Sequence, residues 1–163
     1  MRTLRHLKRK GYALYNVRLW SVRHSRFMEG LYNTVNPAII ATLRGVTKVF
    51  GKKLDKPITA AEAGLKGFLF DCKMCGDCAL SKTGMSCPMN CPKTIRNGPC
   101  GGVRPNGMCE VDENMRCVWV AAWDGASRMK NGDVIKDIEF AVDHRGKGTS
   151  TWLKLAREGK DDA

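Results

Sequence analysis

Eight cysteines lie within one stretch of 46 residues, and the rest of the chain has none. They occupy Cys72, Cys75, Cys78, Cys87, Cys91, Cys100, Cys109 and Cys117. Cysteine thiolates bind zinc and iron–sulfur clusters, and cysteine pairs form disulfides in oxidising compartments. Eight thiols suffice for two four-ligand metal sites without help from histidine, and His6, His24 and His144 all lie outside the stretch. The sequence therefore predicts that all eight cysteines are metal ligands.

The first three cysteines are each two residues from the next, in the pattern C-x2-C-x2-C. This spacing favours an iron–sulfur cluster, because one loop then delivers three thiolates to three irons of a cubane. Cys87 and Cys91 each precede a proline, and in bacterial ferredoxins the Cys-Pro ligand belongs to the other of two clusters. We expect two [4Fe–4S] clusters, one held by the first three cysteines and one later cysteine. The spacing does not identify that later cysteine.

Zinc is the alternative in one or both sites, because four thiolates also form a tetrahedral zinc site. Separated pairs of C-x2-C are usual for zinc, whereas the triple spacing favours iron–sulfur. Disulfides are disfavoured, because we find no secretory signal and no apolar run of the ~20 residues that span a bilayer. We therefore expect a cytoplasmic protein with reduced thiols. A catalytic cysteine is disfavoured because no His/Asn constellation surrounds any candidate.

The positive charge of the chain is concentrated toward its N-terminus. The formal net charge is +12, and residues 1–53 carry twelve Lys or Arg residues against one acid, Glu29. Such a basic segment suits an acidic partner, which could be a protein, a nucleic acid or a membrane surface. Nucleic acid is disfavoured, because aromatic residues are not interleaved with the bases of the nearly neutral cysteine region. We favour docking on a protein and keep a peripheral membrane contact as the alternative.

The expected fold is a small α domain with an irregular, metal-bound core of cysteine-rich loops, flanked by N-terminal amphipathic helices and a C-terminal helix. Four regions are predicted from composition. They are a basic helical arm for partner docking at 1–53, a linker at 54–71, a cysteine-rich metal-binding domain at 72–130 and a C-terminal extension at 131–163.

Local signals predict where the helices before the cysteine region begin and end. Residues 1–35 are loosely periodic, with expected breaks at Gly11 and Gly30. A helix is predicted from a cap at Asn36 to Gly51, with a proline at its first position. Its apolar face holds Ile39, Leu43, Val46 and Phe50. The capping-box spacing of Thr59 and Glu62 predicts a further helix that starts at Ala60. The apolar run at 67–70 is expected to cover the metal region.

After the cysteines, the spacing of Trp119, Trp123 and Met129 predicts a helix that starts near Cys117. We expect both tryptophans to pack against the metal region rather than to relay electrons. Ser150 or Thr151 is expected to cap a short last helix. For the polar residues Arg96, Asn97 and Arg104, hydrogen bonding within the loop is favoured over contact with a partner or charge tuning of a cluster.

The string CPMNCPKTIRNGPCGGVRPNGMCEV at residues 87–111, followed by CVWVAAWDGA at 117–126, resembles the cysteine-rich domain at the C-terminus of some methylenetetrahydrofolate reductases. It also resembles the free-standing small subunit of the two-subunit, flavin-dependent reductases of that family. The resemblance is strong over residues 64–130, and all eight cysteines match the cysteine pattern of the family.

The resemblance implies a catalytic partner, a TIM-barrel reductase subunit that carries FMN or FAD and the folate site. The chain is shorter than the ~250 residues of a TIM barrel and shows no glycine-rich dinucleotide fingerprint. The expected function is that of an iron–sulfur accessory subunit, not catalytic alone, which transfers electrons during reduction of methylene- to methyl-tetrahydrofolate in one-carbon metabolism. A further electron donor or acceptor protein is expected. The alternatives are a structural zinc-binding subunit that stabilises the barrel and, below it, a nucleic-acid-binding zinc protein.

Overall fold

The computed structural model describes residues 14–158 of the chain. Its α-helices are α2 (Ser25–Phe50), α3 (Asp55–Phe70), α4 (Val118–Ala126) and α5 (Thr151–Glu158), and residues 14–23 are also helical. Short 3₁₀ helices span η1 (Pro88–Asn90), η2 (Gly132–Lys136) and η3 (His144–Gly146). Over residues 14–158 there is no strand, only one antiparallel bridge between Met108 and Arg116. The predicted small helical fold with an irregular cysteine region is confirmed.

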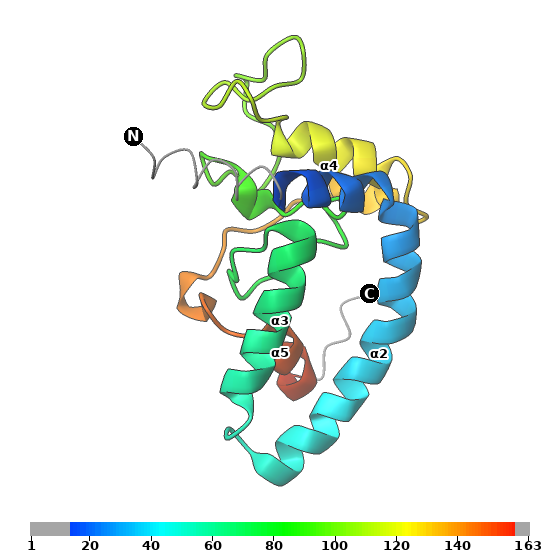
Figure 1. The fold of residues 1–163 in the computed structure, drawn as a ribbon, viewed down its shortest axis with the longest axis vertical. Helices are drawn as coiled ribbons and strands as arrows, with labels where there is room; N and C mark the ends of the chain where they lie inside the picture. Colours follow the sequence, from blue (N-terminus) through cyan, green and yellow to red (C-terminus); the bar gives the residue numbers. More distant parts are fainter. Residues whose placement is uncertain (1–13, 159–163) are drawn as a thin grey trace.

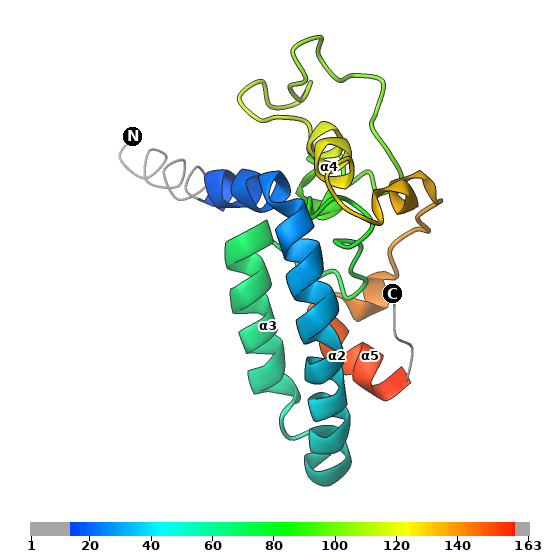
Figure 2. The same ribbon diagram turned by 90° about the vertical axis from the view of Figure 1, so that its right-hand side faces the viewer.

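The helices α2 and α3 diverge from the turn at 51–54, and α5 packs against both of them (Figures 1 and 2). A small core cluster joins Ile40 of α2 to Leu155 and Ala156 of α5. The cysteine-rich loops and α4 lie at the end of the molecule that is remote from this turn (Figure 1). Within the described part of the chain, no helix combines the length and apolar character needed to cross a bilayer.

The helix α2 begins at Ser25, so the prediction of a start at Asn36 was wrong. The break lies at His24, and the expected break at Gly30 is absent, whereas Gly11 lies outside the described residues. Tertiary contacts explain the longer helix. The buried carboxylate of Glu29 accepts the backbone N–H groups of Lys130 and Asn131 at 2.7 and 2.9 Å. These contacts hold the first turns of α2, so the helix continues through its proline despite the lost backbone bond.

The helix α2 ends at Phe50, and Gly51 follows as its C-cap, as the sequence predicted. Gly51 has a φ of 58°, and its N–H donates to the carbonyl of Thr47 at 3.0 Å. A positive φ is readily adopted by glycine, because it has no Cβ to clash with the backbone. The predicted apolar face is confirmed in part, because Leu43 packs against the cluster around Ile40 while Phe50 is 53 % exposed.

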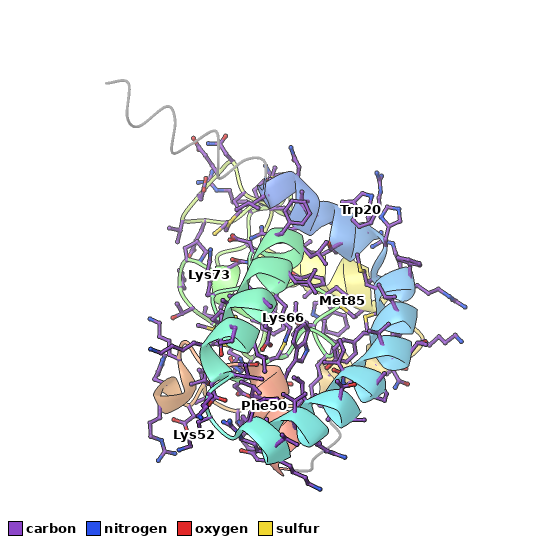
Figure 3. All side chains as sticks on the ribbon, turned by 60° about the horizontal axis from the view of Figure 1, so that its bottom comes forward. Trp20, Phe50, Lys52, Lys66, Lys73 and Met85 are labelled. Carbon is purple, nitrogen blue, oxygen red and sulfur yellow. The ribbon has the colours of Figure 1, made fainter. Side chains whose placement is uncertain are left out.

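The helix α3 begins at Asp55, five residues before the predicted start at Ala60. Glu62 does not cap it but is wholly buried within the helix. The apolar run at 67–70 forms the last turn of α3, and the expectation that it covers the cysteine region is confirmed for Leu69 and Phe70 but not for Phe68, which is 58 % exposed. Its Phe70 belongs to a core cluster with these buried residues: Met28, Leu80, Met85, Cys87 and Met129. Figure 3 shows Met85 and Lys66 among the side chains between α2 and α3.

The predictions after the cysteine region are confirmed except for Trp123, which was expected to pack against the metal region but is 45 % exposed. The helix α4 begins directly after Cys117. Trp119 is buried and packs in a cluster with Cys117, and its Nε1 donates to the carbonyl of Ile95 at 3.0 Å. Ser150 caps α5, because its hydroxyl oxygen accepts the N–H of Leu153 at 3.1 Å.

The cysteine-rich loops meet α4 through two glycines. A Cβ on Gly84 would lie 2.2 Å from the carbonyl oxygen of Ala122, and a Cβ on Gly125 would lie 2.0 Å from the carbonyl oxygen of Gly84. Gly84 also has a φ of 58°. Both backbones are therefore in direct contact, and no side chain fits between them.

Replacing Gly84 with alanine should destabilise the protein by about 3 kcal/mol or more, because the new Cβ clashes with backbone and the positive φ disfavours alanine. The melting temperature should fall by roughly 10 °C, measured by circular dichroism. Gly64→Ala is the matched control, since Gly64 lies inside α3 with open space at its Cβ position. This variant should gain up to about 1 kcal/mol. Equal melting temperatures for the two variants would contradict the close contact.

Candidate metal centre

The eight cysteines divide into two groups of four, each of which lines one small cavity. Cys72, Cys75, Cys78 and Cys87 line the first cavity, together with Lys66 and Arg96. Cys91, Cys100, Cys109 and Cys117 line the second cavity, beside Trp119. All eight thiols are free, so no disulfide links them. Spacing did not identify which later cysteine lies with the first three, and in the structure Cys87 lines the same cavity as they do.

Among residues 14–158, no three His, Cys, Asp or Glu side chains converge tightly enough to hold a metal ion. The four cysteines of each group therefore line the same cavity, but their side chains do not form a coordination sphere. Four cysteines per cavity is the donor set that one [4Fe–4S] cluster or one structural zinc ion requires. The residues present fit either metal group.

The first cavity is built by the loop that follows α3. The backbone N–H of Met74 donates to the sulfur of Cys72 at 3.3 Å, and the thiol of Cys75 lies 3.2 Å from the carbonyl of Asp77. The C-terminal extension packs on this loop, because Gly148 donates its N–H to the carbonyl of Met74 at 2.7 Å. A Cβ on Gly76 would lie 2.1 Å from the carbonyl oxygen of Gly146. The loop is thus held by its own hydrogen bonds and by contacts with residues 146–148.

The 3₁₀ helix η1 separates the two Cys-Pro steps. Cys87 precedes it and Cys91 follows it. The side-chain Nδ2 of Asn90 donates a hydrogen bond to the backbone carbonyl of Phe70 at 3.0 Å. This bond fixes η1 beside the end of α3. As a result Cys87 lies in the first cavity, whereas Cys91 lies in the second.

The second cavity is closed by a short backbone ladder. Cys109 donates its N–H to the carbonyl of Met115 at 2.8 Å, and Cys117 donates to the carbonyl of Gly107 at 3.0 Å. These bonds bring Cys109 and Cys117 together at the start of α4. The sulfur of Cys100 lies 3.9 Å from the carboxylate of Glu110, which also pairs with Lys93.

The thiols of the first cavity differ in acidity. A hydrogen bond from Cys87 lowers the pKa of Cys72 to about 6, and the N–H of Met74 acts in the same direction. The same bond, followed by burial, raises the pKa of Cys87 well above its ordinary value. Burial also raises the pKa of Cys78, although the charge of Lys66 opposes this. Cys72 therefore favours the thiolate form that binds metal.

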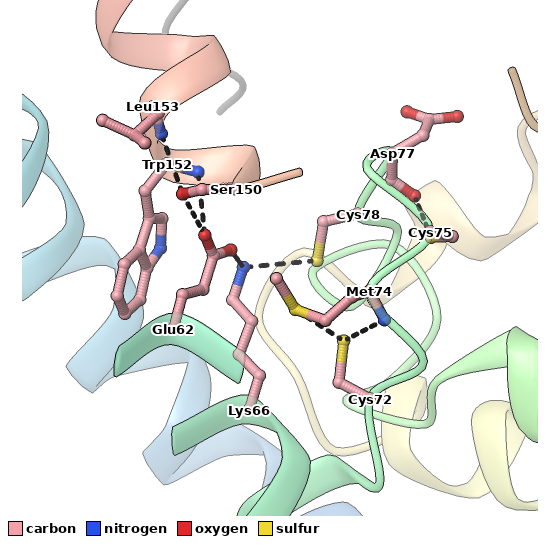
Figure 4. A network of polar contacts seen from close by, with 10 residues as sticks. All are labelled: Glu62, Lys66, Cys72, Met74, Cys75, Asp77, Cys78, Ser150, Trp152 and Leu153. Atoms are coloured by element: carbon pink, nitrogen blue, oxygen red, sulfur yellow. Dashed lines mark hydrogen bonds and ion pairs between the residues drawn. The ribbon is translucent and has the colours of Figure 1, made fainter. Parts of the chain in front are cut away.

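A buried polar network joins this cavity to two helices (Figure 4). On α3, Lys66 donates to the carboxylate of Glu62 at 2.5 Å, and its ammonium lies 3.9 Å from the sulfur of Cys78. The other carboxylate oxygen of Glu62 accepts the hydroxyl of Ser150 and, at 3.4 Å, the backbone N–H of Trp152. Burial alone would lower the pKa of Lys66, but Cys78 and Glu62 raise it above its ordinary value. Lys66 is therefore charged at neutral pH.

Sequence reasoning missed Lys66, Glu62 and Ser150 as parts of this site. The spacing of Glu62 and Lys66 is that of an i,i+4 ion pair, which was the available signal. Nothing local indicated that the pair is buried, because the side chains that cover it come from α5.

Of the three polar loop residues, Arg96 and Arg104 pair with acidic side chains of the same chain, whereas Asn97 is exposed. Arg96 is buried and its guanidinium pairs with Asp77 at 2.8 Å and with Glu139 at 3.5 Å. Arg104 is exposed and lies 3.7 Å from Glu113. Arg96 also lines the first cavity, so it is close to the cysteines without being bonded to them.

One comparison with known proteins gives a match. A family model described as methylene-tetrahydrofolate reductase C terminal matches residues 52–145, which is more than half of the chain and includes all eight cysteines. No curated protein matches the chain. No solved structure matches it either.

Replacing Ser150 with alanine should destabilise the protein by about 1–3 kcal/mol, because α5 loses its cap and the buried carboxylate of Glu62 loses a donor. Urea unfolding followed by circular dichroism measures the change. Thr42→Ala is the control, since Thr42 is exposed and its hydroxyl bonds only to Ala38 of its own helix. That variant should stay within about 0.5 kcal/mol of the parent protein. A loss no larger for Ser150→Ala than for the control would show that the network does not support the fold.

Proposed function

The chain belongs to the methylene-tetrahydrofolate reductase C-terminal family, and we propose that it is an iron–sulfur accessory subunit of a flavin-dependent methylenetetrahydrofolate reductase. The observation that carries this proposal is the division of eight free thiols into two cavities of four. Two four-thiol sites are what two [4Fe–4S] clusters need, and the C-x2-C-x2-C spacing of the first site is that of cluster-binding loops.

The proposed ligands of the first cluster are Cys72, Cys75, Cys78 and Cys87, and those of the second are Cys91, Cys100, Cys109 and Cys117. When bound, each cluster supplies a centre that accepts and releases one electron. The chain holds the first site against a buried apolar cluster that contains Phe70 and Met85. Trp119 and Val118 are buried beside the second site. Cys87, Cys109 and Cys117 are themselves buried, and solvent exposure is one determinant of cluster potential.

The proposed partner is a TIM-barrel reductase that carries FMN or FAD and binds the folate. The proposed role of the chain in the reduction of methylene- to methyl-tetrahydrofolate is to pass electrons to or from the flavin. A further electron-transfer protein would complete the path. The basic N-terminal segment is proposed to contact the partner, and the complex is proposed to act in the cytoplasm.

A structural zinc-binding subunit is the second candidate. The all-thiol composition of each group of four favours it, because Cys₄ sites are common for structural zinc. In that case the metals would hold the loops in place for contact with the barrel and would carry no electrons.

Iron and acid-labile sulfide should be found at about eight of each per chain in anaerobically purified protein, as two [4Fe–4S] clusters require. Cys87→Ala and Cys91→Ala should each lower the iron content to about half, because each removes a ligand of a different site. Zinc without iron in the parent protein would reject electron transfer and favour the structural alternative.

The assignment of ligands is tested by pairs of substitutions. Cys78→Ala combined with Cys87→Ala removes two ligands of one proposed site, so about four irons should remain. Cys87→Ala combined with Cys91→Ala damages both sites, so little iron should remain. The same iron content in both double variants would contradict the proposed division.

Co-expression with a TIM-barrel subunit of the reductase family should give a stable complex that contains flavin. The two chains should elute together in size-exclusion chromatography, and photoreduction of the flavin under anaerobic conditions should reduce the clusters. Elution of the chain apart from the barrel at micromolar concentration would contradict the proposed partnership.

A further inference from the structure

The ammonium group of Lys66 lies beside one proposed cluster ligand and is otherwise enclosed by protein. We propose that Lys66 is a positioning residue that raises the reduction potential of the cluster at Cys72, Cys75, Cys78 and Cys87 by placing a fixed positive charge and an N–H donor at the sulfur of Cys78. This inference rests on the proposed function, because it needs a cluster in the first cavity.

Three contacts define the position of the ammonium group. It lies 2.5 Å from the carboxylate of Glu62, 3.9 Å from the sulfur of Cys78 and 5.0 Å from the centre of the Trp152 ring. The residue is 6 % exposed. Solvent therefore screens its charge poorly, and the field at the sulfur is stronger than that of a surface lysine.

The carboxylate of Glu62 holds the ammonium in this place. Its second oxygen is engaged by the hydroxyl of Ser150 and the N–H of Trp152, both contributed by the start of α5. Because Glu62 is held by these two donors, its ion pair with Lys66 fixes the ammonium within 3.9 Å of the sulfur of Cys78.

The network around Glu62 has a structural role, because it joins α3 to the start of α5 through Ser150 and Trp152. That role needs a counter-charge for Glu62, but it does not require the ammonium to lie 3.9 Å from the sulfur of Cys78. The second contact is explained when the sulfur of Cys78 is a thiolate ligand. Arg96, the other cation of the cavity, pairs with Asp77 and Glu139.

A [4Fe–4S] cluster with four thiolate ligands supplies that anion. Its core passes from 2+ to 1+ when it accepts one electron from an external reductant, and the net charge with the thiolates goes from −2 to −3. No bond breaks and no proton is needed. A positive charge and hydrogen bonds to sulfur stabilise the reduced state more than the oxidised state, so they raise the potential.

The test is a redox titration of the cluster-loaded protein with dithionite and mediators, followed by electron paramagnetic resonance. The double variant Glu62→Gln with Lys66→Met removes the ammonium beside Cys78 together with its counter-charge, so no unpaired buried carboxylate remains. Its equilibrium constant for reduction should fall about ten-fold, which is about 59 mV for one electron. Glu62→Gln alone should shift the potential in the opposite direction, because Lys66 then lacks its counter-charge.

Lys73→Met combined with Asp71→Asn is the matched control. Lys73 lies in the same cysteine loop, but its side chain is half exposed and pairs with Asp71 at 2.7 Å. Removing this exposed ion pair should change the equilibrium constant much less, because solvent screens its charges.

An unchanged potential in the double variant, with its cluster intact, would overturn the inference while the proposed function stands. A shift of the same size in the control variant at Lys73 and Asp71 would also overturn it. If the double variant does not retain its cluster, Glu62→Gln decides, since a potential that fails to rise contradicts a fixed charge at Lys66. Zinc in place of iron in the parent protein would remove the proposed function and the inference together.

Discussion

A wholly buried carboxylate, that of Glu62, constrains the arrangement of the molecule. Such a group is tolerated only when its charge is paired and its oxygens accept hydrogen bonds. Lys66 supplies the charge from the same helix, whereas the donors Ser150 and Trp152 come from a segment almost ninety residues later. The end of the chain must therefore return to α3. In returning, α5 also covers α2, and the residues before it pack on the first cysteine loop.

The two groups of cysteines occupy different structural settings. The first lies where α3 ends, next to an apolar cluster and a buried charge network. The second lies at the start of α4 and is shaped mainly by backbone hydrogen bonds between loops. Two metal groups with the same cysteine ligands would thus lie in different protein environments. Because hydrogen bonding and solvent exposure tune cluster potential, two clusters in this chain would differ in potential.

Sequence reasoning succeeded where the determinants are local. Three features depend on only a few neighbouring residues, and all three were predicted. They are the end of α2 at Gly51, the start of α4 after Cys117 and the cap of α5. The starts of α2 and α3 were not, because buried Glu29 and Glu62 make contacts with residues about 90–100 positions away. Residue types alone identified all eight candidate ligands. Their division into two groups required the path of the chain through η1.

The contact between the C-terminal extension and the first cysteine loop has a consequence for the order of assembly. Gly148 is bonded to Met74, and the backbone of Gly146 touches that of Gly76. During synthesis, residues 72–87 leave the ribosome well before residues 144–150. A metal group delivered in that interval would meet an open loop, and the later segment would then close over it. Residues 144–150 would then close a site whose ligands were made earlier.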